Sequence, residues 1–231
     1  ILDLAVLDQQ KTSLQLKSSD FIRFNSGGAH ISVRYEQHWQ RQALAQLIES
    51  EDASITPSER LLVLNDSLMQ SRAGASSIIE TLELLAAFHN ERQETVWNVM
   101  SLCIADSRRL VETNEAAEVI MKSYVFGLVS NLYSELGWQK QKSEALNDTK
   151  LRSTILSLAC YSEKPEVIAE ALAQYASFEN IAAMPADTRH ILLAMAVKHG
   201  KKDDFESLFA AYPKEINAEL QQDICGALST T

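Results

Sequence analysis

The side chains that could bind a metal ion or transfer a proton are few, and they are scattered along the chain. The histidines lie far apart, at His30, His38, His89, His190 and His199. None is in an H-E-x-x-H pattern, which places two zinc ligands one turn apart on a helix. The chain also lacks C-x-x-C, the phosphate-binding G-x-x-x-x-G-K-[S/T] and G-x-G-x-x-G loops, and the G-x-S-x-G nucleophile turn. We predict no catalytic residue and no metal site in this chain.

The remaining reactive groups have simpler structural interpretations. We interpret His190, beside Arg189, as a packing histidine rather than a catalytic base. Glu91, Arg92 and Glu94 precede Trp97 and are expected to form a local structural cluster of polar groups. The cysteines are odd in number and widely spaced, which predicts small buried thiols in a reducing compartment rather than disulfides or a metal site: Cys103, Cys160 and Cys225. The predicted location is cytoplasmic.

The bulk composition excludes several classes of protein. The chain has 231 residues, a net charge of −10 and a sequence pI near 5.0, without a basic stripe. This argues against nucleic-acid partners and anionic membrane surfaces. No apolar run approaches 18 residues, so no membrane-spanning helix is expected. The chain starts at Ile1 without an initiator Met or a basic leader, and we interpret it as a piece of a longer protein.

The first 35 residues have the period of strands. Residues 1–6, 13–16 and 30–35 alternate apolar and polar side chains, and residues 25–28 form a turn-type Asn-Ser-Gly-Gly sequence. Two or three strands cannot form a stable sheet alone. We therefore predict that residues 1–35 are strands from the end of a preceding β domain.

Residues 36–231 have the period of helices throughout. Caps and breakers divide them into about ten predicted helices, at residues 39–48, 56–74, 76–89, 95–110, 114–137, 148–160, 165–178, 185–199, 203–212 and 216–228. Trp39 marks the apolar stripe of the first, and Val119 and Ile120 that of the longest. The short links predict a mainly α fold, an irregular α-solenoid of antiparallel helix hairpins of the HEAT or armadillo sort.

A series of local motifs then follows in order. Residues 29–36 read Ala-His-Ile-Ser-Val-Arg-Tyr-Glu and are followed by Trp39. Pro57-Ser58-Glu59-Arg60 opens a helix that carries Asp66 six residues after the arginine and closes at Ala73-Gly74. Downstream come a leucine-rich helix with Leu82 and Leu85, then Glu91, Trp97, Leu136-Gly137-Trp138, Leu151-Arg152, Pro185-Ala186-Asp187-Thr188-Arg189 and Gly200.

From about residue 13 to the end, this order resembles the C-terminal helical domain of zinc aminopeptidases (the gluzincin family) of the aminopeptidase N, puromycin-sensitive and endoplasmic-reticulum type. The resemblance marks ten structural motif positions: Tyr35, Trp39, Arg60, Asp66, Gly74, Glu91, Trp97, Arg152, Pro185 and Arg189. The chain departs from the family where its strand has Ala29 for glycine and Ser32 for arginine.

The resemblance implies a parent enzyme with zinc as its cofactor, which removes residues from peptide amino termini. The family's zinc-binding and amino-terminus-binding motifs lie upstream of the β domain, so no catalytic residue carries over to this chain. Residues 36–231 would be a non-catalytic domain, incomplete at its C-terminal end, that covers the active-site cavity and controls peptide access. The implied partners are the catalytic and β domains of the same chain and peptide substrates.

Two other interpretations remain at this stage. A helical-repeat scaffold without peptidase activity would bind a protein partner on its concave face. The predicted strands in residues 1–35 argue against it, because a self-contained scaffold has no need of unpaired strands. A free-standing enzyme is disfavoured because the sequence contains no recognisable site.

Overall fold

The computed structural model describes residues 21–28, 31–50 and 55–230, and within these residues the regular elements are helices. The described part contains ten α-helices: α1 (His38–Glu49), α2 (Pro57–Arg72), α3 (Ile78–Leu85), α4 (Glu94–Val111), α5 (Glu115–Leu136), α6 (Leu146–Tyr161), α7 (Pro165–Ala176), α8 (Ala186–His199), α9 (Lys202–Ala211) and α10 (Ala218–Leu228). Short 3₁₀ helices occur at η1 (Ala86–Phe88), η2 (Ile181–Ala183) and η3 (Tyr212–Lys214). The predicted mainly α fold is confirmed.

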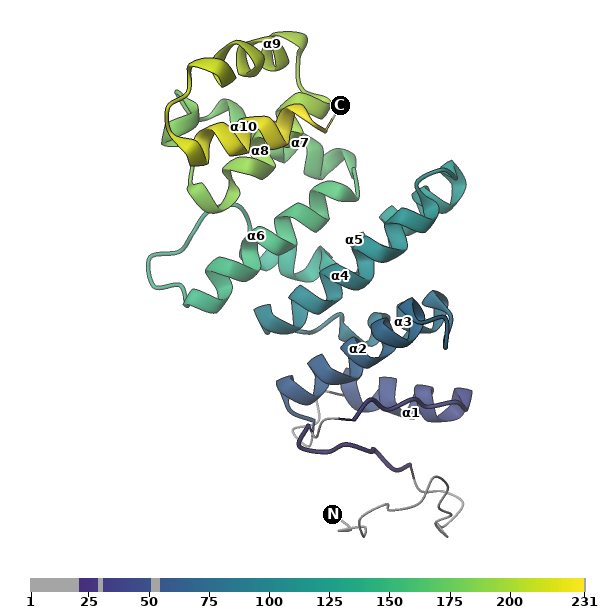
Figure 1. Cartoon of the computed structure of the whole chain (residues 1–231). Coiled ribbons are helices and arrows are strands. Elements are labelled where there is room, and N and C mark those ends of the chain that lie inside the picture. Colours follow the sequence, from purple (N-terminus) through teal and green to yellow (C-terminus); the bar gives the residue numbers. More distant parts are fainter. Residues whose placement is uncertain (1–20, 29–30, 51–54, 231) are drawn as a thin grey trace.

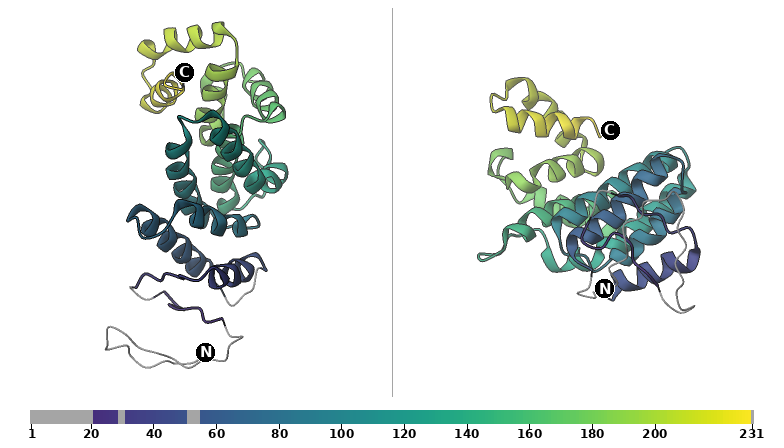
Figure 2. Two further views of the ribbon diagram at one scale, coloured as in Figure 1. Left: turned by 90° about the vertical axis from the view of Figure 1, so that its right-hand side faces the viewer. Right: turned by 60° about the horizontal axis from the view of Figure 1, so that its bottom comes forward.

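The helices follow one another along an elongated body, with α1 near one end and α9 and α10 at the other (Figure 1). The even-numbered helices form one layer, in which α2 contacts α4, α4 contacts α6, α6 contacts α8, and α8 contacts α10. Helices α3, α5, α7 and α9 pack beside them, as the turned views in Figure 2 show. We call the layer of α2, α4, α6, α8 and α10 the inner layer, and α3, α5, α7 and α9 the outer layer. Successive hairpins thus bury their apolar sides against their neighbours.

A continuous apolar core runs along the molecule from α1 to α10. Leu64, Trp97, Ile155 and Leu192 are each at most 1% exposed, and they come from α2, α4, α6 and α8 in turn. Burying side chains of this size stabilises each helix contact by roughly 1.5–3 kcal/mol per residue. The core therefore passes from hairpin to hairpin.

Capping residues fix the helix boundaries. Thr56 and Glu59 form the predicted capping box of α2, with Pro57 as its first residue. Asn114 accepts a hydrogen bond from the Ala117 N–H at the start of α5. Gly137 ends α5 with a φ of 52°, a conformation that favours glycine.

The predicted strand at residues 30–35 is not a strand in this structure. The described part of that segment, from Ile31 to Tyr35, is irregular and belongs to no sheet. A strand is defined by ladder hydrogen bonds to a partner, and no described segment supplies them. The strands predicted at residues 1–6 and 13–16 lie outside the described residues. The boundary between a β domain and a helical domain stays a prediction.

Several side chains predicted to be buried are exposed. Trp39 is 52% exposed, and Val119 and Ile120 on α5 are 63% and 70% exposed. Cys103 and Cys160 are buried as predicted, whereas Cys225 is exposed. Helical periodicity identifies an apolar side, but it does not say whether a neighbouring helix reaches that turn. The predicted helix at residues 76–89 is also divided into α3 and η1.

Candidate functional site: buried arginine junctions

Arg60 joins the start of α2 to the segment before α4. Its Nε and Nη2 atoms donate to the two carboxylate oxygens of Glu91 at 2.6 and 3.0 Å. Its Nη1 atom donates to the Ile55 carbonyl at 3.0 Å. The Glu91 side chain is only 2% exposed, so this two-point pairing supplies the counter-charge that a buried carboxylate requires.

Glu91 also organises the start of α4. Its carboxylate accepts hydrogen bonds from the N–H groups of Arg92 and Gln93, both at 2.9 Å. Its carbonyl accepts from the indole Nε1 of the fully buried Trp97 at 2.7 Å. Of the predicted polar cluster, Glu91 hydrogen-bonds with Trp97, and the Arg92 side chain pairs with Glu135.

Arg152 on α6 plays the corresponding part at the end of α5. Its Nη1 atom donates to the carbonyls of Leu136 and Gly137, the latter at 2.7 Å, and its Nη2 atom pairs with Glu144. Burial opposes ionisation of Glu144, but donors from Gln141, Thr149 and Arg152 lower its pKa below the ordinary value. Arg152 thereby satisfies carbonyl groups that a helix end leaves open.

Arg189 on α8 joins the last hairpin. Its Nε atom donates to Asp223 at 2.6 Å and its Nη2 atom to Glu219 at 2.7 Å, both on α10. The Arg189 N–H donates to the carbonyl of Pro185 at 2.9 Å, at the first turn of α8. The Arg189 side chain is 6% exposed.

The three arginines share one arrangement. Arg60, Arg152 and Arg189 each lie near the start of an inner-layer helix and bind a carboxylate on a neighbouring segment. Because a planar guanidinium can bind a carboxylate and carbonyls at the same time, one side chain fixes both distance and orientation. These contacts join segments of neighbouring hairpins, so the three motif residues set the relative position of the hairpins.

Asp66 and Gln70 on α2 bind the irregular segment Ile31–Tyr35 at its centre, Val33. Asp66 accepts from the Val33 N–H at 2.9 Å, and the Gln70 amide donates to the Val33 carbonyl at 2.8 Å. The Tyr35 carbonyl accepts from Arg41 at 3.0 Å. The peptide groups of Ser32 and Arg34 have no hydrogen-bond partner among the described residues. One edge of the segment is therefore bound to helices, and the alternate peptide groups are left open.

The Glu59 carboxylate is buried and binds several donors, whereas the sequence predicts only its role in the capping box of α2. Its carboxylate pairs with Arg23 at 2.7 Å and accepts from the N–H groups of Gly27 and Thr56, both at 2.8 Å. Burial alone would raise its pKa, but these donors lower it from 4.5 to about 2. The contacts with Gly27 and Arg23 span more than 30 residues, and no local pattern signals them.

Of the other motif positions, Gly74 and Trp39 lie outside these clusters, whereas Tyr35 lies beside Glu59 and Asp66. Gly74 follows α2 with a φ of 69°, which explains why glycine suits the turn, and Trp39 lies exposed on α1. Tyr35 is 9% exposed, and its hydroxyl accepts from the Phe24 N–H at 3.0 Å. The ten positions are thus distributed along the molecule rather than gathered in one cleft.

The described residues do not form a metal site. Across residues 21–28, 31–50 and 55–230, no three His, Cys, Asp or Glu side chains converge as metal ligands would. Burial raises the pKa of both Cys103 and Cys160 to about 12, which leaves these thiols protonated and unreactive. No helix in the described part of the chain is long and apolar enough to span a bilayer.

The fold and its junctions define a mainly α protein of packed helix hairpins, joined by buried arginine–carboxylate contacts. Residues 23–231 match the family model described as the ERAP1-like C-terminal domain, and the chain belongs to this family. The order of motifs noted in the sequence agrees with that membership.

Curated relatives carry aminopeptidase names. Aminopeptidase N of Lactococcus lactis subsp. lactis is 28% identical over 203 residues, covering 87% of this chain and 23% of the relative. Alanine/arginine aminopeptidase of Saccharomyces cerevisiae is 27% identical over 222 residues, covering 93% and 25%. Aminopeptidase M1 of Arabidopsis thaliana is 25% identical over 191 residues, covering 78% and 21%. The chain spans about a quarter of the length of these relatives.

Proposed function

We propose that this chain is the non-catalytic C-terminal domain of a zinc aminopeptidase, which removes residues from peptide amino termini. In the parent protein it covers the active-site cavity and controls which peptides enter. The observation that carries the proposal is the family match over residues 23–231, together with relatives named as aminopeptidases that are about four times longer.

The extended segment supports a β domain immediately before the helices. The peptide groups of Val33 and Tyr35 are bound by side chains of α2 and α1, while those of Ser32 and Arg34 have no partner in the described residues. Alternation of this kind is what the edge strand of a sheet requires, because successive peptide groups point to opposite sides. We propose that residues 1–35 complete the sheet of the parent's β domain.

The zinc ion belongs to other parts of the parent. The described residues provide no converging set of ligands, and their buried carboxylates are already bound by arginines. When bound to the catalytic domain, zinc would polarise the scissile carbonyl and activate water. The part of this chain would be geometric, because its arginine junctions set how neighbouring hairpins pack.

The exposed side of the inner layer is the surface that we propose faces the cavity. On α2 and α4 it carries Met69, Arg72, Leu102 and Arg109, and Arg72 pairs with Asp106, so apolar groups and charges of both signs are present together. Any attraction of a cationic peptide amino terminus would therefore come from the overall charge of −10 rather than from this patch.

The access role is tested by changing one side chain on each layer in the natural full-length protein. Leu102→Arg places a long cation on the inner layer, and Ile120→Arg places the same group on the outer layer, at a position that is also exposed. We expect Leu102→Arg to change kcat/KM for peptides of eight or more residues by about tenfold, and Ile120→Arg to leave it unchanged. Equal effects of the two variants would refute the access role.

A second experiment addresses the parent itself. The natural protein would be captured with an antibody against this chain, and its mass, zinc content and hydrolysis of alanyl and leucyl reporter amides measured. We expect a chain about four times longer with about one zinc per molecule and aminopeptidase activity. A long chain with neither zinc nor activity would favour a binding scaffold. A cytoplasmic location, which we also propose, is tested by fractionating the same cells.

A further inference from the structure

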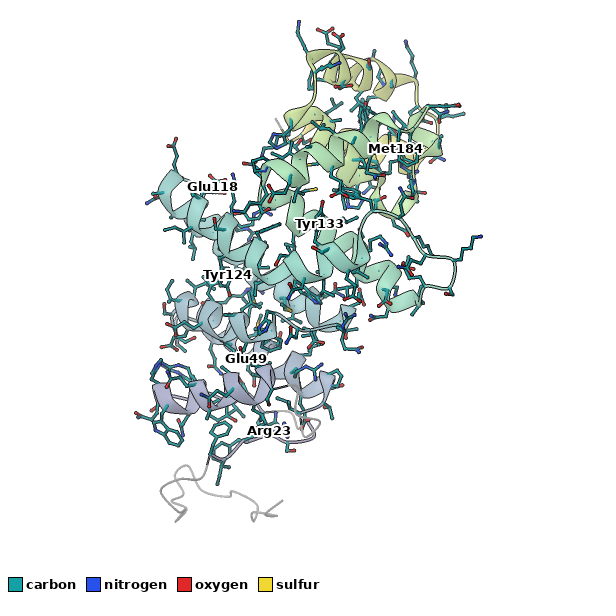
Figure 3. All side chains as sticks on the ribbon, turned by 180° about the vertical axis from the view of Figure 1, so that it is seen from behind. Arg23, Glu49, Glu118, Tyr124, Tyr133 and Met184 are labelled. Carbon is teal, nitrogen blue, oxygen red and sulfur yellow. The ribbon has the colours of Figure 1, made fainter. Side chains whose placement is uncertain are left out.

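Three polar pairs join α5 and its following turn to α7 and its preceding turn. Lys122 pairs with Glu163 at 2.6 Å, the Tyr133 hydroxyl donates to Glu170 at 2.5 Å, and the Gln139 amide donates to Gln174 at 2.9 Å. The pairs follow in order along the two helices, and Tyr133 is labelled on α5 in Figure 3. We call these six residues the outer seam.

The inner layer beside the seam is joined differently. There α6 contacts α8, and each helix carries fully buried apolar side chains, such as Ile155 on α6 and Leu193 on α8. Separating α6 from α8 would expose apolar area, which is costly in water. Opening the pairs Tyr133–Glu170 and Gln139–Gln174 exchanges solvent-accessible hydrogen bonds for bonds to water, at small net cost. These exposed polar pairs are therefore easier to open than the apolar contact of α6 with α8.

Glu163 connects the seam to α8. Its carboxylate forms ion pairs with Lys122 on α5 and Lys198 on α8, and the Nε2 atom of His199 lies 3.8 Å from it. The backbone of Glu163 has a φ of 52°, a conformation that side-chain-bearing residues seldom adopt. Strained residues of this kind persist only where surrounding contacts hold them, and they are frequent at switch regions. The turn between α6 and α7 is thus held in place by ionic contacts.

We propose that the outer seam is a conformational clasp. When its three pairs break, α7–α10 swing away from α1–α5, with the apolar contact of α6 and α8 as the pivot and the turn at Glu163 absorbing the change. The clasp follows from the contacts alone. Its effect on peptide entry, through the curvature of the inner layer, rests on the proposed function.

The clasp is tested by single-molecule energy transfer in the natural full-length protein. Dyes would be attached through noncanonical amino acids at Ser123 on α5 and Ala169 on α7, both exposed. The seam variant combines three substitutions that preserve side-chain size: Lys122→Met, Tyr133→Phe and Gln139→Met. The control is Lys202→Met, which breaks the exposed Lys202–Glu206 pair on α9, away from the seam.

We expect the ratio of the long-distance to the short-distance population to rise about tenfold in the seam variant and to stay unchanged in the control. An unchanged ratio in a seam variant with normal helical content would overturn the clasp. If the triple variant loses helical content, Tyr133→Phe alone removes one hydroxyl, and its expected rise is about two- to fivefold. An unchanged ratio in that variant would equally overturn the proposal.

Peptide hydrolysis by the same variants separates the two proposals. A rise in the long-distance population with unchanged kcat/KM for long peptides would support the clasp and refute the access role. A rise together with altered selection of long over short peptides would support both.

Discussion

At the scale of residues, buried charges are concentrated at the joints between hairpins. Arg60, Arg152 and Arg189 each neutralise a carboxylate from another segment, and Glu59 does the same for Arg23. Removing one partner of such a pair leaves the other charge buried without compensation, which is more destabilising than the pair is stabilising. These side chains therefore constrain how successive hairpins meet.

Arg152→Met tests this at the best-enclosed junction. The substitution leaves Glu144 buried and removes donors from two carbonyls at the end of α5. We expect the free energy of unfolding, measured by urea denaturation, to fall by about 3–5 kcal/mol. Lys202→Met, which removes an exposed pair with Glu206, should cost less than about 1 kcal/mol. Equal losses would show that Arg152 has no special role.

Glu59 predicts a pH dependence of stability. Its pKa in the folded chain is about 2, lowered from 4.5, so the folded state binds fewer protons than the unfolded state between these values. Its contribution is complete above about pH 5 and is lost as the pH falls towards 2. Glu59→Gln should therefore lower the unfolding free energy by roughly 2 kcal/mol at pH 7, and by clearly less at pH 3. A loss independent of pH would contradict the ionic account.

At the scale of elements, the helix boundaries depend on a few backbone positions. Gly137 ends α5 with a φ of 52°, whereas Gly127 lies within the same helix, and a Cβ atom at either position meets no atom within 4 Å. Any difference between alanine substitutions at these two sites must then come from backbone conformation rather than from crowding.

We expect opposite signs for the two alanine variants. Gly137→Ala should lower the free energy of unfolding by about 1–2 kcal/mol, because a positive φ is unfavourable for alanine. Gly127→Ala should raise it by about 0.5–1 kcal/mol through its helix propensity. Calorimetry of the two variants gives both values. A shared sign would mean that α5 ends differently in solution.

At the scale of the whole molecule, residues 31–35 are where we propose that this chain meets the rest of the parent. The Val33 N–H is bound by Asp66, whereas the Ser32 and Arg34 N–H groups have no partner in the described residues. We expect hydrogen exchange at Ser32 and Arg34 to be fast in this chain and slowed at least tenfold in the full-length protein, where the sheet would pair them. Val33 should be slow in both. Fast exchange at Ser32 and Arg34 in the full-length protein would refute the β-domain proposal.

Some of this structure is determined by the sequence alone. The apolar period, the Thr56–Glu59 capping box and the glycine after α5 predict the helices close to their observed bounds, because capping and periodicity act over a few residues. The motif order also predicts the family. Only the tertiary structure shows which apolar residues are covered, as the exposure of Val119 and Ile120 demonstrates.

The tertiary structure also decides the charge pairing. Arg60 meets Glu91, and Arg189 meets Asp223, across more than 30 residues. No local rule selects these partners from the many charged residues of the chain. Residues 31–35 also show that local pattern is not sufficient. Their alternation predicts a strand, but a strand forms only where a partner segment supplies hydrogen bonds. Local sequence determines the helices and their caps, which depend on contacts within a few residues. Packing between distant segments determines which side chains are buried and which charges pair.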